Sequence, residues 1–104
     1  MIIYGIPACD TCRKARAALE GRAEWRDLRK TPLTPEEVDE VLATFGDRAI
    51  NRSSTTWRQL DDETRTLSAR ELLLAHPTLL KRPLIRTDAD LHIGWTAAVQ
   101  EQVL

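Results

Sequence analysis

The sequence has 104 residues, of which 42% are hydrophobic and 30% charged, and its 15 basic and 16 acidic side chains give a formal net charge of −1. This length suits one compact domain, and the balanced charge gives no reason to expect direct binding to nucleic acid or to a membrane. No apolar run is long enough to span a bilayer and no signal-peptide pattern opens the chain, so we expect a cytoplasmic protein.

The first third of the chain predicts a strand, a helix and a second strand. Residues 1–5 contain three successive large apolar side chains, which is typical of a strand buried on both faces. Residues 10–20 carry apolar side chains at helical spacing, and Gly21 ends the predicted helix. Residues 24–29 alternate weakly between apolar and polar side chains, which indicates a second strand.

The middle of the chain predicts helices. Thr34-Pro35-Glu36-Glu37 and Ser68-Ala69-Arg70-Glu71 both place a hydroxyl three residues before a glutamate, which is the pattern of a helix N-terminal capping box. We expect the first helix to end at Gly46 and the second at Pro77. The polar segment 49–60 between them is expected to hold short helical turns.

The last part predicts a hairpin of strands 82–86 and 91–95, and then a helix capped by Thr96. A parallel βαβ half and an antiparallel ββα half combine into a mixed four-stranded sheet with flanking helices, which is the α/β arrangement called thioredoxin-like or glutaredoxin-like. We therefore predict a single domain over residues 1–104 with a helical insertion over about 34–80, between the two halves.

The only two cysteines, Cys9 and Cys12, lie at the start of the first predicted helix. In a cytoplasmic protein such a pair is more typical of catalysis, redox sensing or metal binding than of a structural disulfide. A helix N-terminus lowers the pKa of a thiol at its tip, which makes Cys9 the expected nucleophile. Cys12, one turn further along, is placed to resolve a mixed disulfide formed at Cys9. The alternative is a pair of ordinary reduced thiols.

A zinc site is the second alternative for this cysteine pair. Zinc needs two more ligands, and the only histidines, His76 and His92, are far apart in the sequence, whereas zinc ligands usually come in closely spaced pairs. We therefore expect no metal site.

Several segments together resemble the ArsC/Spx family. They are Pro-Ala-Cys-Asp-Thr-Cys-Arg-Lys-Ala at 7–15, Thr-Thr-Trp-Arg at 55–58, His-Pro at 76–77 and Lys-Arg-Pro-Leu-Ile at 81–85. This family contains glutaredoxin-coupled arsenate reductases, redox-controlled transcription regulators of the Spx type, and small reductase-like proteins. The resemblance covers nearly the whole chain in the same order, and it implies the thioredoxin-like fold.

The resemblance also implies roles for individual residues. Cys9 matches the family's nucleophile, and Cys12 matches the second cysteine of the Spx branch. Arg82 matches the arginine before the family's cis-proline, which Pro83 matches, so the resemblance implies a positive charge beside Cys9 and a substrate-binding role for Pro83. A cis bond at Pro83 would leave the backbone of Arg82 open to pair with a substrate peptide.

The arsenate reductases of the family use three arginines around the oxyanion, and this sequence matches them in part. Arg82 is one of them, the second falls near Asn51 or Arg52, and the third falls at 92–94, which reads His-Ile-Gly here. The departure favours a disulfide or a glutathione adduct over arsenate as substrate. Arg52 and Ser53 are candidates for binding an oxyanion or the carboxylates of glutathione, the alternative being a solvated polar loop.

The sequence therefore predicts a thiol-dependent oxidoreductase that uses Cys9, Cys12 and Arg82. The resemblance implies that glutathione, glutaredoxin or thioredoxin supplies the electrons, with glutathione as co-substrate and no tightly bound cofactor. The alternative function is that of an Spx-like regulator, in which a Cys9–Cys12 disulfide controls binding to RNA polymerase.

Overall fold

The computed structural model describes residues 1–104, and it divides the chain into two compact units. The first unit contains Met1–Thr31 and Arg82–Leu104, and the second contains Pro32–Lys81. The predicted insertion at about 34–80 thus falls within the second unit. Folding of the two units as one domain of 104 residues stays a prediction.

The first unit is built on a four-stranded mixed sheet. Its strands are β1 (Ile2–Gly5), β2 (Glu24–Asp27), β3 (Leu84–Arg86) and β4 (Leu91–Ile93). They lie in the order β2-β1-β3-β4, with β1 parallel to β2 and antiparallel to β3, and with β3 antiparallel to β4. This confirms the predicted sheet, in which a parallel front half joins an antiparallel back half.

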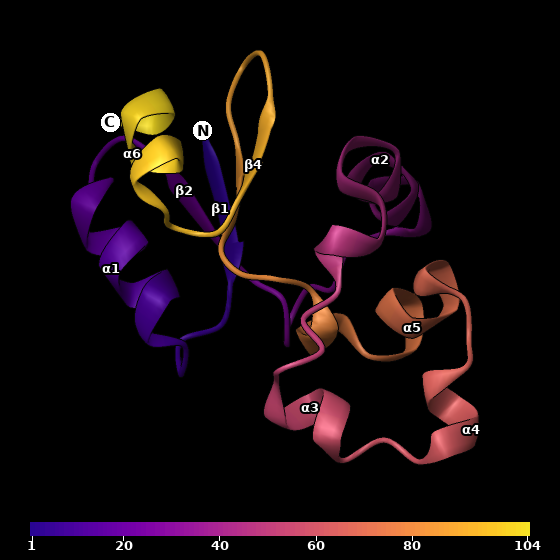
Figure 1. Ribbon diagram of the computed structural model, residues 1–104. Helices are drawn as coiled ribbons and strands as arrows, with labels where there is room; N and C mark the ends of the chain where they lie inside the picture. The colour runs from indigo at the N-terminus through magenta and orange to yellow at the C-terminus, as the bar shows by residue number, and fades with distance from the viewer. The chain divides into compact units, whose positions relative to one another are not determined.

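Two helices, α1 (Asp10–Ala18) and α6 (Ala97–Val103), lie on the same side of this sheet (Figure 1). Ile3 and Ile85 are cross-strand partners, so their side chains share one face of the sheet. Both are fully buried against Leu19 and Val103, and these four residues form the core of the unit. Burying a side chain of this size contributes about 1.5–3 kcal/mol. The flanking helices of the predicted fold are thereby confirmed.

The second strand is shorter than the sequence predicts, because Asp27 starts a turn. Its carboxylate accepts a hydrogen bond from the N–H of Arg29 at 2.9 Å, and its carbonyl accepts from the N–H groups of Lys30 and Thr31. These bonds satisfy the backbone locally, so the chain leaves the sheet at Asp27 rather than at Arg29.

The second unit consists of short helices. They are α2 (Pro35–Phe45), α3 (Thr55–Arg58), α4 (Asp62–Arg65) and α5 (Ala69–Ala75), with 3₁₀ turns η1 (Gly46–Ala49) and η2 (Pro77–Leu79). Helices α2 and α5 pack together and bury their apolar faces, which carry Val38 and Val41 on α2 and Leu72 and Leu73 on α5. None of the helices combines the length and the apolar composition that spanning a bilayer requires.

The two predicted capping boxes differ in detail. At α2, Thr34 accepts from the N–H of Glu37 at 3.1 Å while the Glu37 carboxylate accepts from the N–H of Thr34 at 2.9 Å, which completes the box. At α5, Ser68 accepts from the N–H of Glu71 at 3.2 Å, but the Glu71 carboxylate accepts a hydrogen bond from the Ser68 hydroxyl at 2.9 Å rather than from the Ser68 N–H. The Ser68 hydroxyl thus bonds both the backbone N–H and the carboxylate of Glu71.

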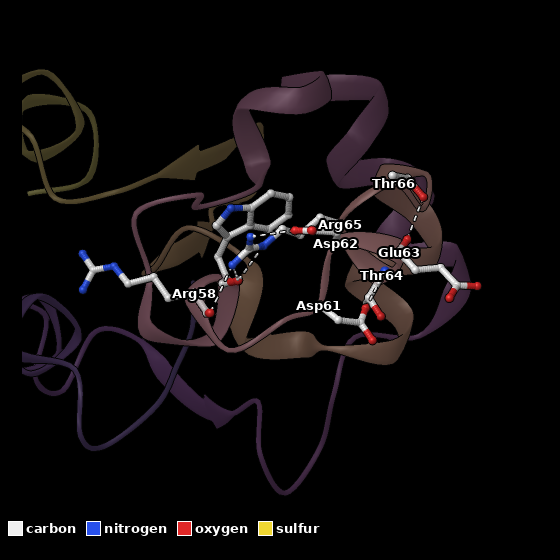
Figure 2. Close-up of polar contacts among 8 residues, drawn as sticks. Arg58, Asp61, Asp62, Glu63, Thr64, Arg65 and Thr66 are labelled. Atoms are coloured by element: carbon white, nitrogen blue, oxygen red, sulfur yellow. Dashed lines mark hydrogen bonds and ion pairs between the residues drawn. The ribbon is translucent and has the colours of Figure 1, made fainter.

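The polar segment between these helices folds as short turns because side chains close their ends (Figure 2). Arg65 donates to the carbonyls of Trp57 and Arg58 at 3.2 and 3.1 Å, which closes the C-terminal end of α3. Asp61 accepts from the N–H of Thr64 at 2.7 Å and so caps α4. The predicted short helical turns are confirmed by α3, which lies within residues 49–60, and a further turn of the same kind, α4, follows beyond residue 60.

Candidate active site

Cys9 is the residue that caps the N-terminus of α1. The chain leaves β1 at Gly5 and turns back, with the N–H of Cys9 donating to the carbonyl of Ile6 at 3.2 Å. Cys9 has an extended backbone (φ −87°, ψ 118°), and its Sγ accepts the N–H of Cys12 at 3.4 Å. The sulfur therefore occupies the place of a capping oxygen, where the unpaired N–H groups of a first helical turn favour a negative charge.

Several groups act on the pKa of Cys9, and their sum lowers it. Partial burial is the largest single influence and raises the pKa. The backbone N–H and the thiol of Cys12 donate to the sulfur, and the Arg82 guanidinium adds a positive charge and a further hydrogen bond. Together these outweigh the burial, so the pKa of Cys9 lies below that of an ordinary thiol. Because Cys9 is only half-buried, its sulfur is accessible to a reagent.

Cys12 has the opposite character. It is fully buried, and burial, together with the charge and hydrogen bond of Cys9, raises its pKa to about 12. Cys9 is the sulfur that accepts the hydrogen bond from the Cys12 N–H, whereas the Cys12 thiol keeps its own proton. The pair is asymmetric: the accessible sulfur has a lowered pKa and the buried thiol a raised one, which suits nucleophilic attack by the outer sulfur.

Gly5, at the end of β1, makes room for the buried thiol. A Cβ at this position would lie 2.5 Å from Cys12 Sγ and 3.1 Å from the ring edge of Trp25. The strand therefore admits only a residue without a side chain at the point where α1 brings Cys12 against the sheet. Sequence reasoning missed this role, although a glycine that ends a strand just before a cysteine pair is the signal that could have shown it.

Arg82 and Pro83 lie in the same unit as the cysteines and lead into β3. The peptide bond between them is cis, as the resemblance implied. Pro83 is buried, and its carbonyl accepts the N–H of Gly94 at 2.8 Å, which ties this turn to the residue after β4. Arg82 is half-buried and its charge reaches Cys9, so the first unit holds Cys9, Cys12, Arg82 and Pro83.

Arg52 and Ser53 belong to the second unit, where both are engaged locally. The Arg52 guanidinium makes a bidentate ion pair with Asp47 at 2.7 and 2.8 Å and lies 5.2 Å from the centre of the Trp57 ring. The Ser53 N–H donates to the side chain of Asn51 at 3.0 Å. An anion bound by Arg52 would have to compete with the Asp47 carboxylate, and the substrate-binding role of these two residues stays a prediction.

The two histidines fall in different units, His76 at the end of α5 and His92 in β4. No three side chains of His, Cys, Asp or Glu lie close enough together to hold a metal ion.

Comparison with known proteins agrees with this fold. The family model described as "ArsC family" matches residues 4–103. The global transcriptional regulator Spx of Listeria innocua is 32% identical over 102 residues, which cover 89% of this chain and 78% of the regulator.

Solved structures show the same likeness. A YFFB protein superposes with a TM-score of 0.89 at 31% identity, covering 99% of this chain and 97% of that one. An arsenate reductase (ArsC) related protein from Brucella melitensis superposes with a TM-score of 0.73 at 38% identity, covering 98% and 92% of the two chains. Since the family model spans nearly the whole sequence and the fold of its relatives is the one described above, this chain belongs to the ArsC family.

Proposed function

We propose that the protein is a thiol-dependent oxidoreductase that acts on a disulfide or a glutathione adduct through the Cys9 thiolate. The observation that carries this proposal is the position of Cys9 at the N-terminus of α1, half-exposed and with its negative charge stabilised by Cys12 and Arg82. A thiolate in such surroundings is a nucleophile near neutral pH.

In the first step, Cys9 attacks one sulfur of a substrate disulfide. A bond forms between the Cys9 sulfur and that sulfur, the substrate S–S bond breaks, and the other half leaves as a thiolate. Cys9 is thereby oxidised to a mixed disulfide while the leaving half is reduced. The Arg82 guanidinium, whose charge lowers the pKa of Cys9, is placed to favour the thiolate that starts the reaction.

In the second step, the mixed disulfide is resolved by Cys12 or by an external thiol. Once Cys9 is bonded in the mixed disulfide it carries no charge. The charge and the hydrogen bond of Cys9 then no longer raise the pKa of Cys12, and of the influences that raise this pKa only burial remains. Cys12 attacks the Cys9 sulfur while its proton passes to the leaving sulfur, which forms a Cys9–Cys12 disulfide, breaks the mixed disulfide and releases the bound half as a thiol. Two equivalents of glutathione, or one of reduced glutaredoxin or thioredoxin, would then return both cysteines to the thiol state.

Trapping of the mixed disulfide tests this mechanism. The Cys12→Ser variant, incubated with glutathione disulfide, should accumulate one glutathione adduct at Cys9, detected by intact mass and peptide mapping. The wild-type protein should show the adduct only transiently, followed by the internal disulfide.

The Cys9→Ser variant is the matched control and should form no adduct at Cys12, because that thiol is buried and protonated. Equal adduct formation in both variants contradicts the assignment of roles. Absence of any adduct in the wild type and in Cys12→Ser contradicts the oxidoreductase proposal.

A second function is favoured by one specific observation, the 32% identity to the Spx regulators over 89% of this chain. In this second proposal, the Cys9–Cys12 disulfide changes the affinity of the protein for RNA polymerase. Capture of purified polymerase by the oxidised and the reduced protein tests it. Capture in one redox state only, in a protein that shows no turnover with disulfides, would favour the regulator over the reductase.

A further inference from the structure

The sheet of the first unit has an open edge at β2. In the strand order β2-β1-β3-β4, this strand has a neighbour on one side only. The N–H groups of Glu24 and Leu28 donate to carbonyls of residues 1–5 at 2.8 and 2.9 Å, so the even-numbered residues of this segment bond to β1. The odd-numbered residues between them therefore turn their backbone groups away from the sheet.

Four backbone groups along this edge are unpaired within the chain. A trans peptide unit points its C=O and the following N–H in opposite directions. The carbonyls of Ala23 and Trp25 and the N–H groups of Trp25 and Asp27 thus point outward, and none of them has a partner in the chain. Such a row of N–H and C=O groups is a template for another strand. A strand added here would form four backbone hydrogen bonds.

The charges of β2 match those of a second copy of the same strand. When two copies of one strand pair antiparallel about a two-fold axis, one residue lies opposite its own copy. An axis at Glu24, Arg26 or Asp27 puts two like charges directly opposite each other, which destabilises the pair. An axis at Trp25 instead puts Glu24 of each copy opposite Arg26 of the other. Of the four pairings that this four-residue strand allows, only the one centred on Trp25 avoids a like-charge contact.

Glu24 and Arg26 are able to form these ion pairs. The side chain of Glu24 is exposed and makes no ion pair within the chain. Arg26 is half-buried, donates through Nε to the carbonyl of Thr31 at 3.0 Å, and lies 5.2 Å from the centre of the Tyr4 ring. These contacts hold the Arg26 side chain beside β2. Because a guanidinium carries five N–H donors, Arg26 can bind a carboxylate of the second copy in addition to them.

The same pairing brings two tryptophans together beside a hollow. Trp25 is half-buried, and its side chain stands on the face of the sheet that carries Ile3, its partner in β1. On this face a hollow of about 510 Å³ is lined by Trp25 together with the small side chains of Ala17 and Ala23. The two Trp25 Cα atoms of a hydrogen-bonded pair would lie about 5.5 Å apart, so the ring of the second copy lies next to the first, beside this hollow. Tryptophan is enriched at the centres of protein interfaces.

We propose that the protein forms a weak two-fold symmetric dimer in which the β2 strands of two copies pair antiparallel, with Trp25 on the axis. Four backbone hydrogen bonds, two ion pairs between Glu24 and Arg26 and the pair of tryptophans join the two sheets into one. A contact of this size is typical of transient complexes, so we expect a dissociation constant of roughly 0.1–1 mM. The dimer is independent of the proposed oxidoreductase function, because neither cysteine takes part in it.

Sedimentation equilibrium of the full chain, kept reduced so that no intermolecular disulfide forms, measures the dimer between about 10 µM and 1 mM. We expect the average mass to rise toward that of a dimer over this range. Amide hydrogen exchange at both ends of the range locates the contact. The N–H groups of Trp25 and Asp27 should exchange more slowly at the high concentration, because only the second copy supplies their partners.

Charge variants test the pairing itself. Glu24→Arg and Arg26→Glu each put like charges opposite each other at both contacts, so each variant alone should dimerise at least about tenfold more weakly than the wild type. An equimolar mixture of the two variants restores opposite charges at both contacts and should associate as the wild type does. Glu101→Arg, the same charge change at an exposed position of α6, is the matched control and should leave dimerisation unchanged. Circular dichroism shows whether each variant is folded.

Three results would overturn the proposal. The first is a wild-type protein that stays monomeric up to about 1 mM, even if an added extended peptide slows the exchange of the Trp25 N–H, because the edge would then serve a different partner. The second is dimerisation of both charge variants to the wild-type extent, which would place the contact on another surface. The third is loss of association in both folded variants without recovery in their mixture, which excludes the pairing centred on Trp25.

Discussion

The backbone N–H of Cys12 points at the sulfur of Cys9 and donates to it at 3.4 Å. This relationship makes the two thiols unequal, although they belong to the same turn of chain. Cys9 collects hydrogen bonds and positive charge that favour its anion, whereas Cys12 is buried beside that anion and keeps its proton. The pair therefore combines an outer sulfur whose anion is favoured with an inner thiol that keeps its proton.

Arg82 is expected to control the reactivity of Cys9. Its charge and its hydrogen bond both lower the pKa of the thiol, so Arg82→Gln should shift the pH midpoint of Cys9 alkylation upward and slow alkylation several-fold at pH 7. The measurement is the rate of carbamidomethylation as a function of pH, followed by peptide mass spectrometry. Lys81→Gln, which changes the neighbouring exposed charge, should leave the midpoint in place. An unchanged midpoint in Arg82→Gln would remove the arginine from the site.

The thiol of Cys12 is expected to lower the pKa of Cys9 as a hydrogen-bond donor. Cys12→Ala removes this donor but keeps the backbone N–H, so the alkylation midpoint of Cys9 should rise above that of the wild type. Cys12→Ser restores a donor in the same place and should bring the midpoint part of the way back. If the alanine and serine variants titrate alike, the backbone N–H alone sets the effect of Cys12.

Replacing Gly5 even with alanine, the smallest residue that has a side chain, is expected to lower the stability of the protein. Gly5→Ala places a Cβ 2.5 Å from Cys12 Sγ, and the resulting displacement should cost about 1–3 kcal/mol of unfolding free energy. The same substitution in the Cys12→Ala background should cost clearly less, because the sulfur it meets is absent. Urea unfolding of the four proteins gives the coupling between the two positions. A coupling of zero would show that the added methyl group is accommodated elsewhere, for example by the Trp25 ring.

Stability should depend on pH through the two thiols in opposite directions. The lowered pKa of Cys9 adds stability that is complete above the ordinary thiol pKa of about 8.5 and is lost as the pH falls through the folded-state pKa. The raised pKa of Cys12 adds stability that is complete below that pH and is lost as the pH rises toward about 12.

The unfolding free energy of the reduced protein should therefore decline above about pH 8.5, and it should decline less steeply in Cys12→Ala. Chemical unfolding at several pH values, in the presence of a reductant, measures both slopes. Parallel slopes for the two proteins would mean that Cys12 is not held in its protonated form by the fold.

The capping box of α2 should contribute measurably to the stability of the second unit. Thr34→Ala removes the hydroxyl that accepts the N–H of Glu37, and the expected loss is about 1 kcal/mol. Thr44→Ala on the same helix is the control, since Thr44 is exposed and its hydroxyl only bonds back to the carbonyl of Glu40. A comparable loss at both positions would show general sensitivity of the helix rather than the effect of a cap.

Local patterns predicted most of the elements because each is encoded by near neighbours. The hydroxyl-to-glutamate spacing at Thr34 marked the start of α2, and Gly46 marked its end, since both signals act within one turn of helix. The ends of the strands were predicted less well. Strand β2 stops at Asp27 because the Asp27 side chain and carbonyl take up the next N–H groups, and neither bond follows from alternation of apolar residues.

The sequence by itself determined the cysteine pair, the helix that begins beside it and the order of strands that makes a mixed sheet. Only the tertiary structure decided the difference between the two thiols, because burial and the approach of Arg82 come from segments some 70 residues apart in the chain. It also decided the role of Gly5, whose missing side chain matters only where α1 packs Cys12 against β1. A pattern of neighbours reports local geometry, whereas a pKa and a steric limit depend on everything that surrounds the atom in space.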